Sequence, residues 1–278
     1  MTGSTGGIGT EIAKLLAQRG WNLALVNRSK TKSEEQAAEL KRSFPGVSVN
    51  VYVADLMDQT KIVAACSEIV HAHPKLEALY NVAGFLSDKR MTSPQNIEGH
   101  FALNTIAPYL FTKHLMDPLA AGGRPDNRSV VVNFGSSAVN SVKTLDVQTL
   151  ANPAKVGGLM GAYANTKLAL TAMTLAMSGT AGASTVSYLT VDPGPTKTSM
   201  TGSGDGMPWF IRLLAPLLFK PADVQAERIV DSVQQAVADG ESGLYISEGR
   251  RKPFPRLATD EALQGEIVNL LDQLTNRL

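Results

Sequence analysis

Short β-rich runs alternate with amphipathic helical segments along almost the whole chain. The β-rich runs cover residues 23–26, 47–53, 76–80, 129–134, 186–191 and 244–247. Between them, apolar residues recur at helical spacing over residues 8–19, 33–43, 61–72, 100–116, 163–177 and 223–238. Strands that alternate with helices form a parallel sheet covered on both faces, and such sheets bind ligands at the carboxyl ends of their strands. The pattern therefore predicts a doubly wound α/β fold.

The composition fits one soluble domain. The chain has 278 residues, of which 44% are hydrophobic, so it can bury a sizeable core. No repeat or linker divides it, and we expect a single domain over residues 1–278. The net charge of +1 offers no footprint for nucleic acid. No apolar run reaches the roughly 18 residues that span a bilayer, and the first residues do not resemble a signal peptide. We therefore expect a cytoplasmic protein, without membrane contact.

A glycine-rich turn, TGSTGGIG at residues 2–9, leads directly into the first predicted helix. Glycine lets backbone N–H groups approach a pyrophosphate at a helix N-terminus, although a turn of this composition can also be an ordinary tight loop. Only Met1 stands where the strand before such a turn should lie. Because a central strand would then be missing, we expect the native gene product to start upstream of Met1.

The run at 23–26 is followed by Asn27 and Arg28 rather than by an acid. Proteins that bind NAD beside such a turn carry an acid here for the ribose 2′-hydroxyl. Arg28 offers instead a charge-assisted pair to the 2′-phosphate of NADP. We therefore expect NADP(H) as the cofactor, with NAD(H) less favoured. The alternative is that Arg28 is a solvated surface residue.

Seven motifs follow one another along the chain. They are TGxxxGxG at Thr2, Gly3, Gly7 and Gly9, then Asp55-Leu56, Asn81-Val82-Ala83-Gly84, Asn104, Ser136-Ser137, YxxxK at Tyr163 and Lys167, and Pro193-Gly194-Pro195-Thr196-Lys197-Thr198. In this order they resemble the short-chain dehydrogenase/reductase family, with Val82 where the family has a second asparagine. The resemblance implies a Rossmann-type fold and a nicotinamide-dependent oxidoreductase that acts on an alcohol or carbonyl group.

The resemblance also implies which residues bind the dinucleotide. They are Gly3, Ser4, Gly7, Ile8, Gly9, Arg28, Asp55, Leu56, Asn81, Ala83, Gly84, Tyr163, Lys167, Pro193, Gly194, Thr196 and Thr198. A narrower resemblance, to the retinol-dehydrogenase-like branch, rests on three features. These are Glu98-Gly99-His100-Phe101, Ser242-Gly243-Leu244-Tyr245 and the long insertion between Ser137 and Tyr163.

The catalytic set implied by the resemblance is Asn104, Ser137, Tyr163 and Lys167. Tyr163 and Lys167 stand four residues apart and so share one face of a helix. A nearby ammonium and the positive nicotinamide favour the phenolate, which makes Tyr163 the expected acid/base. Ser137, in preference to its neighbour Ser136, is expected to stabilise charge on the substrate oxygen. Asn104 would hold a water molecule of a proton relay through its side-chain amide. The alternative is that this amide satisfies polar backbone groups at a helix kink.

No metal site is expected. The four histidines, His71, His73, His100 and His114, form no ligand motif with nearby acids and are interpreted as surface or packing residues. No G-x-S-x-G turn follows a strand, which excludes the serine hydrolases built on that turn. Cys66, the single cysteine, lies in an apolar stretch and is predicted to be a core residue.

Residues 199–222 are predicted to form a lid over the substrate. This segment contains a glycine-rich stretch at 202–206 and an apolar run at 207–219. A core helix or a membrane-surface patch are the alternatives. The expected substrate is therefore a lipophilic alcohol, aldehyde or ketone. Two other functions stay open: a scaffold or sensor that binds a dinucleotide but catalyses weakly, and a peripheral membrane enzyme anchored by residues 207–219. The family resemblance is also compatible with a homodimer.

Overall fold

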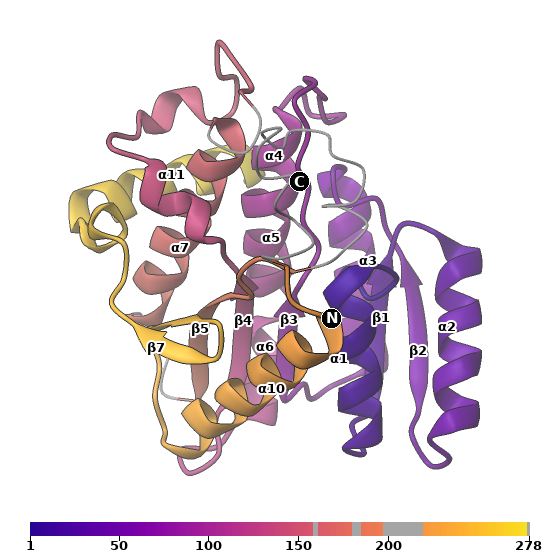
Figure 1. The fold of residues 1–278 in the computed structure, drawn as a ribbon. Coiled ribbons are helices and arrows are strands. Elements are labelled where there is room, and N and C mark those ends of the chain that lie inside the picture. Colours follow the sequence, from indigo (N-terminus) through magenta and orange to yellow (C-terminus); the bar gives the residue numbers. More distant parts are fainter. Residues whose placement is uncertain (158–160, 180–184, 197–218, 277–278) are drawn as a thin grey trace.

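The computed structural model describes residues 1–157, 161–179, 185–196 and 219–276 (Figure 1). The strands are β1 (Leu23–Asn27), β2 (Val49–Val53), β3 (Ala78–Asn81), β4 (Ser129–Phe134), β5 (Val186–Asp192), β6 (Leu244–Ser247) and β7 (Arg250–Lys252). The longer helices are α1 (Gly7–Gln18), α2 (Lys30–Ser43), α3 (Gln59–Ala72), α5 (Ala107–His114), α6 (Met116–Gly122), α7 (Ala162–Ser178), α10 (Ala222–Ala238) and α11 (Glu261–Thr275). The shorter ones are α4 (Gly99–Phe101), the π-helical η1 (Ala102–Ile106) and the 3-10 helices η2 (Ser137–Ser141), η3 (Val147–Thr149) and η6 (Arg256–Thr259).

The predicted strands are confirmed, with boundaries that differ by a few residues, and so are the predicted helices except one. The segment predicted as a single helix over 100–116 is divided into α4, η1 and α5. Helix α11 and strand β7 were not predicted from the sequence. Asp260 caps α11 by accepting from the backbone N–H of Leu263 at 3.1 Å, and the helix buries Ile267 and Leu271. Among the described helices, none combines the length and apolar character needed to cross a membrane.

The strands form one layer with helices on both faces. β1 pairs in parallel with β2, while β3, β4, β5 and β6 form a second parallel run that ends in the antiparallel β7. One apolar core joins the sheet to α1, α2 and α10, and the other joins it to α3, α5, α7 and α11 (Figure 1). This arrangement confirms the predicted doubly wound sheet. Cys66 lies in the second core, as predicted.

The two runs of strands meet at the N-terminal residues. Thr2 bridges Val26 of β1 and Asn81 of β3, and the backbone carbonyl of Met1 accepts from Val26 at 2.9 Å. Beside Met1, between β1 and β3, lies a cavity of about 680 Å³ whose lining includes Trp21 and Tyr80. Met1 and Thr2 therefore connect the two runs of strands directly before the glycine-rich turn.

Candidate active site

The glycine-rich turn brings the start of α1 to the carboxyl ends of β1 and β3. Gly3 and Gly7 have φ values of +70° and +47°, which favour glycine. A Cβ atom at Gly9 would lie 2.1 Å from the carbonyl oxygen of Gly3. Gly6 caps the helix without a side-chain hydrogen bond, the first turn holds no acid, and Ile8 points into the core. An anion could therefore approach the backbone N–H groups at the N-terminus of α1 closely.

Ser4 connects the glycine-rich turn to α2 and β1 through hydrogen bonds. Its Oγ donates to Oε1 of Gln36 at 2.7 Å and accepts from Nδ2 of Asn27 at 2.8 Å. Gln36 in turn donates to the carbonyl oxygen of Ser4 at 2.6 Å. The sequence predicts Ser4 as a cofactor residue, but its buried side chain holds the turn in place. Gln36, on α2, is a partner to which no sequence motif pointed.

Several basic side chains lie between the end of β1 and the first turn of α2. Arg28 is exposed and forms no hydrogen bond or ion pair with any other residue that the structure describes. Ser29 caps α2, whose first turn carries Lys30 and Lys32 and no acid. The guanidinium of Arg28 is therefore free for an anion, at the place where the sequence predicts the 2′-phosphate.

Asp55 and Leu56 lie at the same edge of the sheet. Asp55 is half-buried, and its Oδ1 accepts from the backbone N–H of Met57 at 3.0 Å. Leu56 is buried in the core. The backbone N–H of Ala54 donates to the carbonyl of Asn27 at 3.1 Å, which holds this loop beside the end of β1.

Asn81, Ala83 and Gly84 follow β3. The side chain of Asn81 turns inward, where its Nδ2 donates to Oδ1 of Asn133 on β4 at 2.8 Å. A Cβ atom at Gly3 would lie 2.7 Å from Cα of Ala83, so the loop after β3 packs directly on the glycine-rich turn. Asn81 therefore supports the sheet with its side chain, while Ala83 and half-buried Gly84 border the turn with their backbone.

Pro193, Gly194 and Thr196 follow β5. Gly194 has a φ of +69°, and a Cβ atom there would lie 2.7 Å from the side chain of Glu248. The carbonyl of Pro193 accepts from Gln225 of α10, and Thr196 donates through Oγ1 to the carbonyl of Gly194 at 3.0 Å. These contacts fix the loop at the same sheet edge. Thr198 lies outside the described residues.

Tyr163 and Lys167 lie on one face of α7, as predicted. Nζ of Lys167 is 5.9 Å from the centroid of the Tyr163 ring and donates to the carbonyl of Phe134, at the end of β4, at 2.6 Å. Burial raises the pKa of Tyr163 to about 12, although a hydrogen bond with Ser136 opposes the increase. Burial lowers the pKa of Lys167 to about 8, and the nearby carboxylate of Asp192 opposes that decrease. Without cofactor, Tyr163 therefore keeps its proton.

Ser136, rather than Ser137, contacts the tyrosine. The hydroxyl of Ser136 lies near enough to the Tyr163 hydroxyl to oppose the increase in its pKa, and it accepts from the backbone N–H of Ala138 at 3.2 Å. Ser137 is exposed, and its backbone N–H donates to Asp192. The structure therefore places Ser136, and not the expected Ser137, beside the Tyr163 hydroxyl. The physical reason is that the chain enters η2 directly after Ser136, which turns the next side chain toward solvent.

Asn104 joins the loop after β3 to α7. It lies in the π-turn η1, a feature that often marks functional sites, and it is fully buried. Its Oδ1 accepts from the N–H of Phe85 at 2.8 Å, and its Nδ2 donates to the Phe85 carbonyl at 2.9 Å and to Oγ1 of Thr166 at 3.4 Å. Both amide hydrogens are thus engaged, which leaves one oxygen lone pair for the predicted water.

Two buried carboxylates beside the site were not predicted from the sequence. Asp192, at the end of β5, accepts from Gly194 N–H at 2.9 Å and from Ser247 Oγ at 3.0 Å, and burial raises its pKa. Its only sequence signal is its position directly before Pro193. The other is Glu98, whose Oε1 lies 2.8 Å from Nδ1 of His100.

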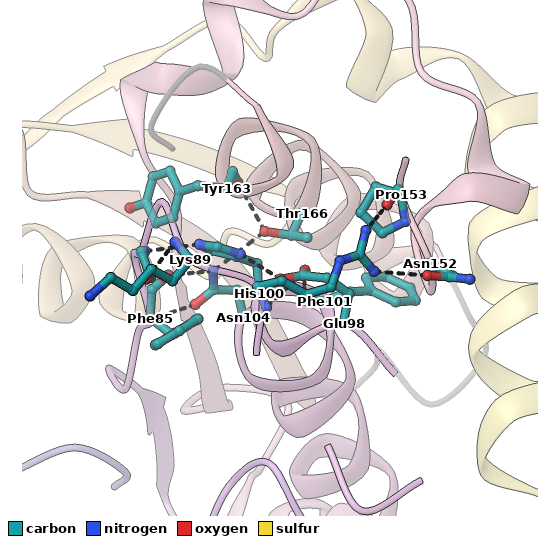
Figure 2. A network of polar contacts seen from close by, with 12 residues as sticks. Phe85, Lys89, Glu98, His100, Phe101, Asn104, Asn152, Pro153, Tyr163 and Thr166 are labelled. Carbon is teal, nitrogen blue, oxygen red and sulfur yellow. Dashed lines mark hydrogen bonds and ion pairs between the residues drawn. The ribbon is translucent and has the colours of Figure 1, made fainter. Parts of the chain in front are cut away.

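His100 is a correction to the sequence analysis. It is not a surface or ordinary packing residue: it is fully buried, paired with Glu98, and lies between Phe85 and Tyr163 (Figure 2). The Glu-x-His spacing at the start of a helix is the signal that could have indicated this pair. Within the described ranges, no group of three or more His, Cys, Asp or Glu side chains could hold a metal ion.

Only part of the two predicted substrate segments is described. In the insertion between Ser137 and Tyr163, Val147 and Leu150 are buried in the core, while residues 158–160 lie outside the described ranges. Most of the predicted lid, residues 199–218, also lies outside them.

Comparison with known proteins identifies the family. A family model for short chain dehydrogenases matches residues 1–207. The chain is 27% identical over 284 residues to polyprenol dehydrogenase of Homo sapiens, covering 100% of this chain and 84% of that protein. It is also 27% identical over 269 residues to human retinol dehydrogenase 13, covering 94% and 79%. These relatives agree with the resemblance to the retinol-dehydrogenase-like branch.

Solved structures share the fold. A putative uncharacterized protein from Mycobacterium paratuberculosis has a TM-score of 0.72 at 21% identity, covering 99% of this chain and 91% of that one. A short-chain dehydrogenase from Sphingobium yanoikuyae in complex with NADPH has a TM-score of 0.67 at 22% identity, covering 98% and 94%. A 3-ketoacyl-(acyl-carrier-protein) reductase from Brucella melitensis, complexed with NADH, has a TM-score of 0.66 at 20% identity, covering 88% and 93%. Since the family model spans well over half of the sequence, this chain belongs to the short-chain dehydrogenase family.

Proposed function

We propose that this protein transfers a hydride between NADP(H) and a lipophilic alcohol, aldehyde or ketone. The observation that carries the proposal is the group of Ser136, Tyr163 and Lys167, which meets at the carboxyl ends of β4 and β5 beside the glycine-rich turn. A scaffold without catalysis would not need a buried lysine held beside a buried tyrosine, because burial of an ammonium opposes folding.

The residues present fit a dinucleotide. The N-terminus of α1 and the close turn at Gly3 and Gly9 would hold the pyrophosphate, since a side chain at Gly9 would fill that space. Arg28, with the N-terminus of α2, would hold the 2′-phosphate, which supports NADP(H) over NAD(H). Asp55 and Leu56 would border the adenine, and Lys167 the nicotinamide ribose. Structural neighbours of this chain bind NADPH in one case and NADH in another.

Each side chain of the catalytic group has a separate task. When bound, the nicotinamide supplies or accepts the hydride. Tyr163, protonated in the free protein, donates its proton to the carbonyl oxygen during reduction. Ser136 donates a hydrogen bond to the same oxygen and so stabilises the charge that develops there. Lys167 places a positive charge beside the Tyr163 ring, which favours the phenolate once the proton has left.

A lipophilic substrate is supported by the relatives and by the sequence. Two relatives carry names that refer to polyprenol and retinol, both long apolar alcohols. The apolar run at 207–219, of which residues 207–218 lie outside the described residues, supplies a candidate lid. We therefore choose two isoprenoid aldehydes as probes, retinaldehyde and the shorter citral.

The first experiment combines binding and turnover. Fluorescence titration with NADPH and NADH should show tighter NADPH binding in the wild type, and Arg28→Ala should weaken NADPH at least tenfold while NADH changes little. Arg42→Ala, which removes an exposed arginine at the far end of α2, is the matched control. Tyr163→Phe should keep NADPH affinity and lose aldehyde reduction. Nucleotide binding without turnover of either aldehyde by the wild type would favour the scaffold function instead.

A further inference from the structure

The loop at 85–90, which leaves the carboxyl end of β3, is held by side chains of another segment. Asn104 hydrogen-bonds both backbone groups of Phe85. Two residues further on, the backbone N–H of Ser87 donates to Nε2 of His100 at 3.0 Å. Asn104 and His100 come from η1 and α4, so one continuous helical segment fixes the start of the loop at two points (Figure 2).

These hydrogen bonds determine the tautomer of His100. A backbone N–H can only donate, so the Nε2 atom that faces Ser87 carries no proton. The proton is on Nδ1, which donates to Oε1 of Glu98 at 2.8 Å. Oε2 of Glu98 accepts from the backbone N–H of His100 at 2.9 Å and of Phe101 at 3.4 Å. The buried carboxylate therefore orients the ring, and the ring holds the loop.

The ring of His100 also sets the spacing between the loop and the catalytic helix. Its centroid lies 4.8 Å from that of the Phe85 ring and 6.4 Å from that of Tyr163, with an edge-on angle of 79° to the tyrosine. His100 has no exposed surface. Because buried rings cannot move independently of their contacts, a shift of the loop would change the space beside Tyr163.

The far end of the loop reaches the insertion that precedes α7. Nη1 of Arg90 donates to Oδ1 of Asn152 at 2.8 Å, and Nη2 donates to the carbonyl of Pro153 (Figure 2). The position of the loop is therefore transmitted to the segment between Ser137 and Tyr163.

We propose that Glu98 and His100 are positioning residues that fix the loop at 85–90 as the wall of the substrate site beside Tyr163. This inference rests on the proposed oxidoreductase function. His100 acts through Ser87 and not on the reacting atoms, so its loss should disturb substrate placement and leave nucleotide binding intact.

Two substitutions at His100 test the hydrogen bonds of its two ring nitrogens separately. His100→Gln places an oxygen near the former Nε2 and can still accept from Ser87, whereas His100→Asn keeps a donor near the former Nδ1 for Glu98 and offers no acceptor to Ser87. His71→Asn, at an exposed histidine of α3, is the matched control. Arg90→Met, at an exposed residue, releases the other end of the loop without disturbing the core.

Hydrogen exchange at the Ser87 amide and steady-state reduction of retinaldehyde with NADPH are measured for each variant. We expect faster Ser87 exchange in His100→Asn by tenfold or more, a kcat/KM reduced about tenfold mainly through KM, and an unchanged NADPH affinity. His100→Gln should stay within threefold of the wild type, and Arg90→Met should raise KM at an unchanged melting temperature.

The pair has no positioning role if His100→Asn keeps wild-type exchange and kinetics, or if both histidine variants lose activity equally. Should His100→Asn fail to fold, an unchanged KM in Arg90→Met would equally overturn the proposal. A wild type that reduces neither probe would contradict the proposed function, whereas Ser87 exchange still tests the link between His100 and the loop.

Discussion

Burial of the tyrosine side chains sets the protonation of the free protein. The chain has six tyrosines, and burial raises the pKa of every one of them: Tyr52, Tyr80, Tyr109, Tyr163, Tyr188 and Tyr245. A raised pKa means that an acid keeps its proton to a higher pH. A ground-state phenol suits a residue that gives its proton to a carbonyl oxygen.

This gives a spectroscopic prediction. The near-ultraviolet absorbance of phenolate in the folded, cofactor-free protein should show no step from Tyr163 near pH 10, because the pKa of Tyr163 is about 12. Oxidised NADP should introduce one step at lower pH, since the positive nicotinamide favours the phenolate. The same titration of Tyr163→Phe should lack that step. A one-tyrosine step near pH 10 that disappears in the variant without cofactor would contradict the assignment.

The two adjacent serines provide a second prediction. Ser136→Ala should reduce kcat/KM for aldehyde reduction about 100-fold, because a hydrogen bond to the developing oxyanion is lost. Ser137→Ala should stay within threefold of the wild type, since this side chain is exposed. Both variants should bind NADPH normally in a fluorescence titration. Loss only in Ser137→Ala would restore the sequence-based choice, and equal loss in both would show that Ser136 has no separate role.

Motif spacing predicted which types of residue meet at the site, but it did not identify every individual residue. Tyr163 and Lys167 were predictable because helical periodicity alone places them on one face. Ser136 and Ser137 could not be separated, because the turn into η2 decides which side chain faces the tyrosine. The contact of His100 with Ser87 could not be predicted, because it is made to a backbone group; only the Glu-x-His spacing indicated the pair with Glu98.

At the scale of elements, the sequence predicted regular helices and strands better than their irregular joints. Apolar periodicity was enough for α1, α7 and α10. The π-turn η1 was not predicted, because the extra residue that it inserts changes no residue type. It is this turn that carries Asn104, which can therefore bond Phe85 and Thr166 together.

The glycine-rich turn leads to a prediction about α1. Gly9→Ala should weaken NADPH binding at least tenfold, because the added methyl group would lie 2.1 Å from the carbonyl oxygen of Gly3 and the turn must open. Gly265→Ala is the matched control: this exposed position in α11 has open space around it. The control should bind NADPH normally and raise the free energy of unfolding by about 0.5–1 kcal/mol. Fluorescence titration and urea unfolding measure the two effects.

For the whole molecule, the sheet topology predicts unequal local stability. β4 and β5 are buried along their whole length, whereas β1 and β2 form a smaller, two-stranded part of the sheet, and β2 has exposed residues at Asn50 and Val53. Amide hydrogen exchange should therefore be slower in β4 and β5 than in β1 and β2, because openings of the smaller part break fewer contacts. Uniform protection across all four strands would show that the sheet opens only as a unit.

The bridge at Thr2 also has a thermodynamic consequence. Arg28 and Asp55 lie on the smaller part of the sheet, while Tyr163 and Lys167 lie on the larger part. A ligand that contacts both parts binds only when they are together, so its binding free energy adds to the cohesion between them. At a concentration 100 times its Kd, such a ligand raises the apparent stability by about 2.7 kcal/mol. The dinucleotide would thus act as a non-covalent cross-link, and a saturating concentration of it should slow proteolysis of the folded chain.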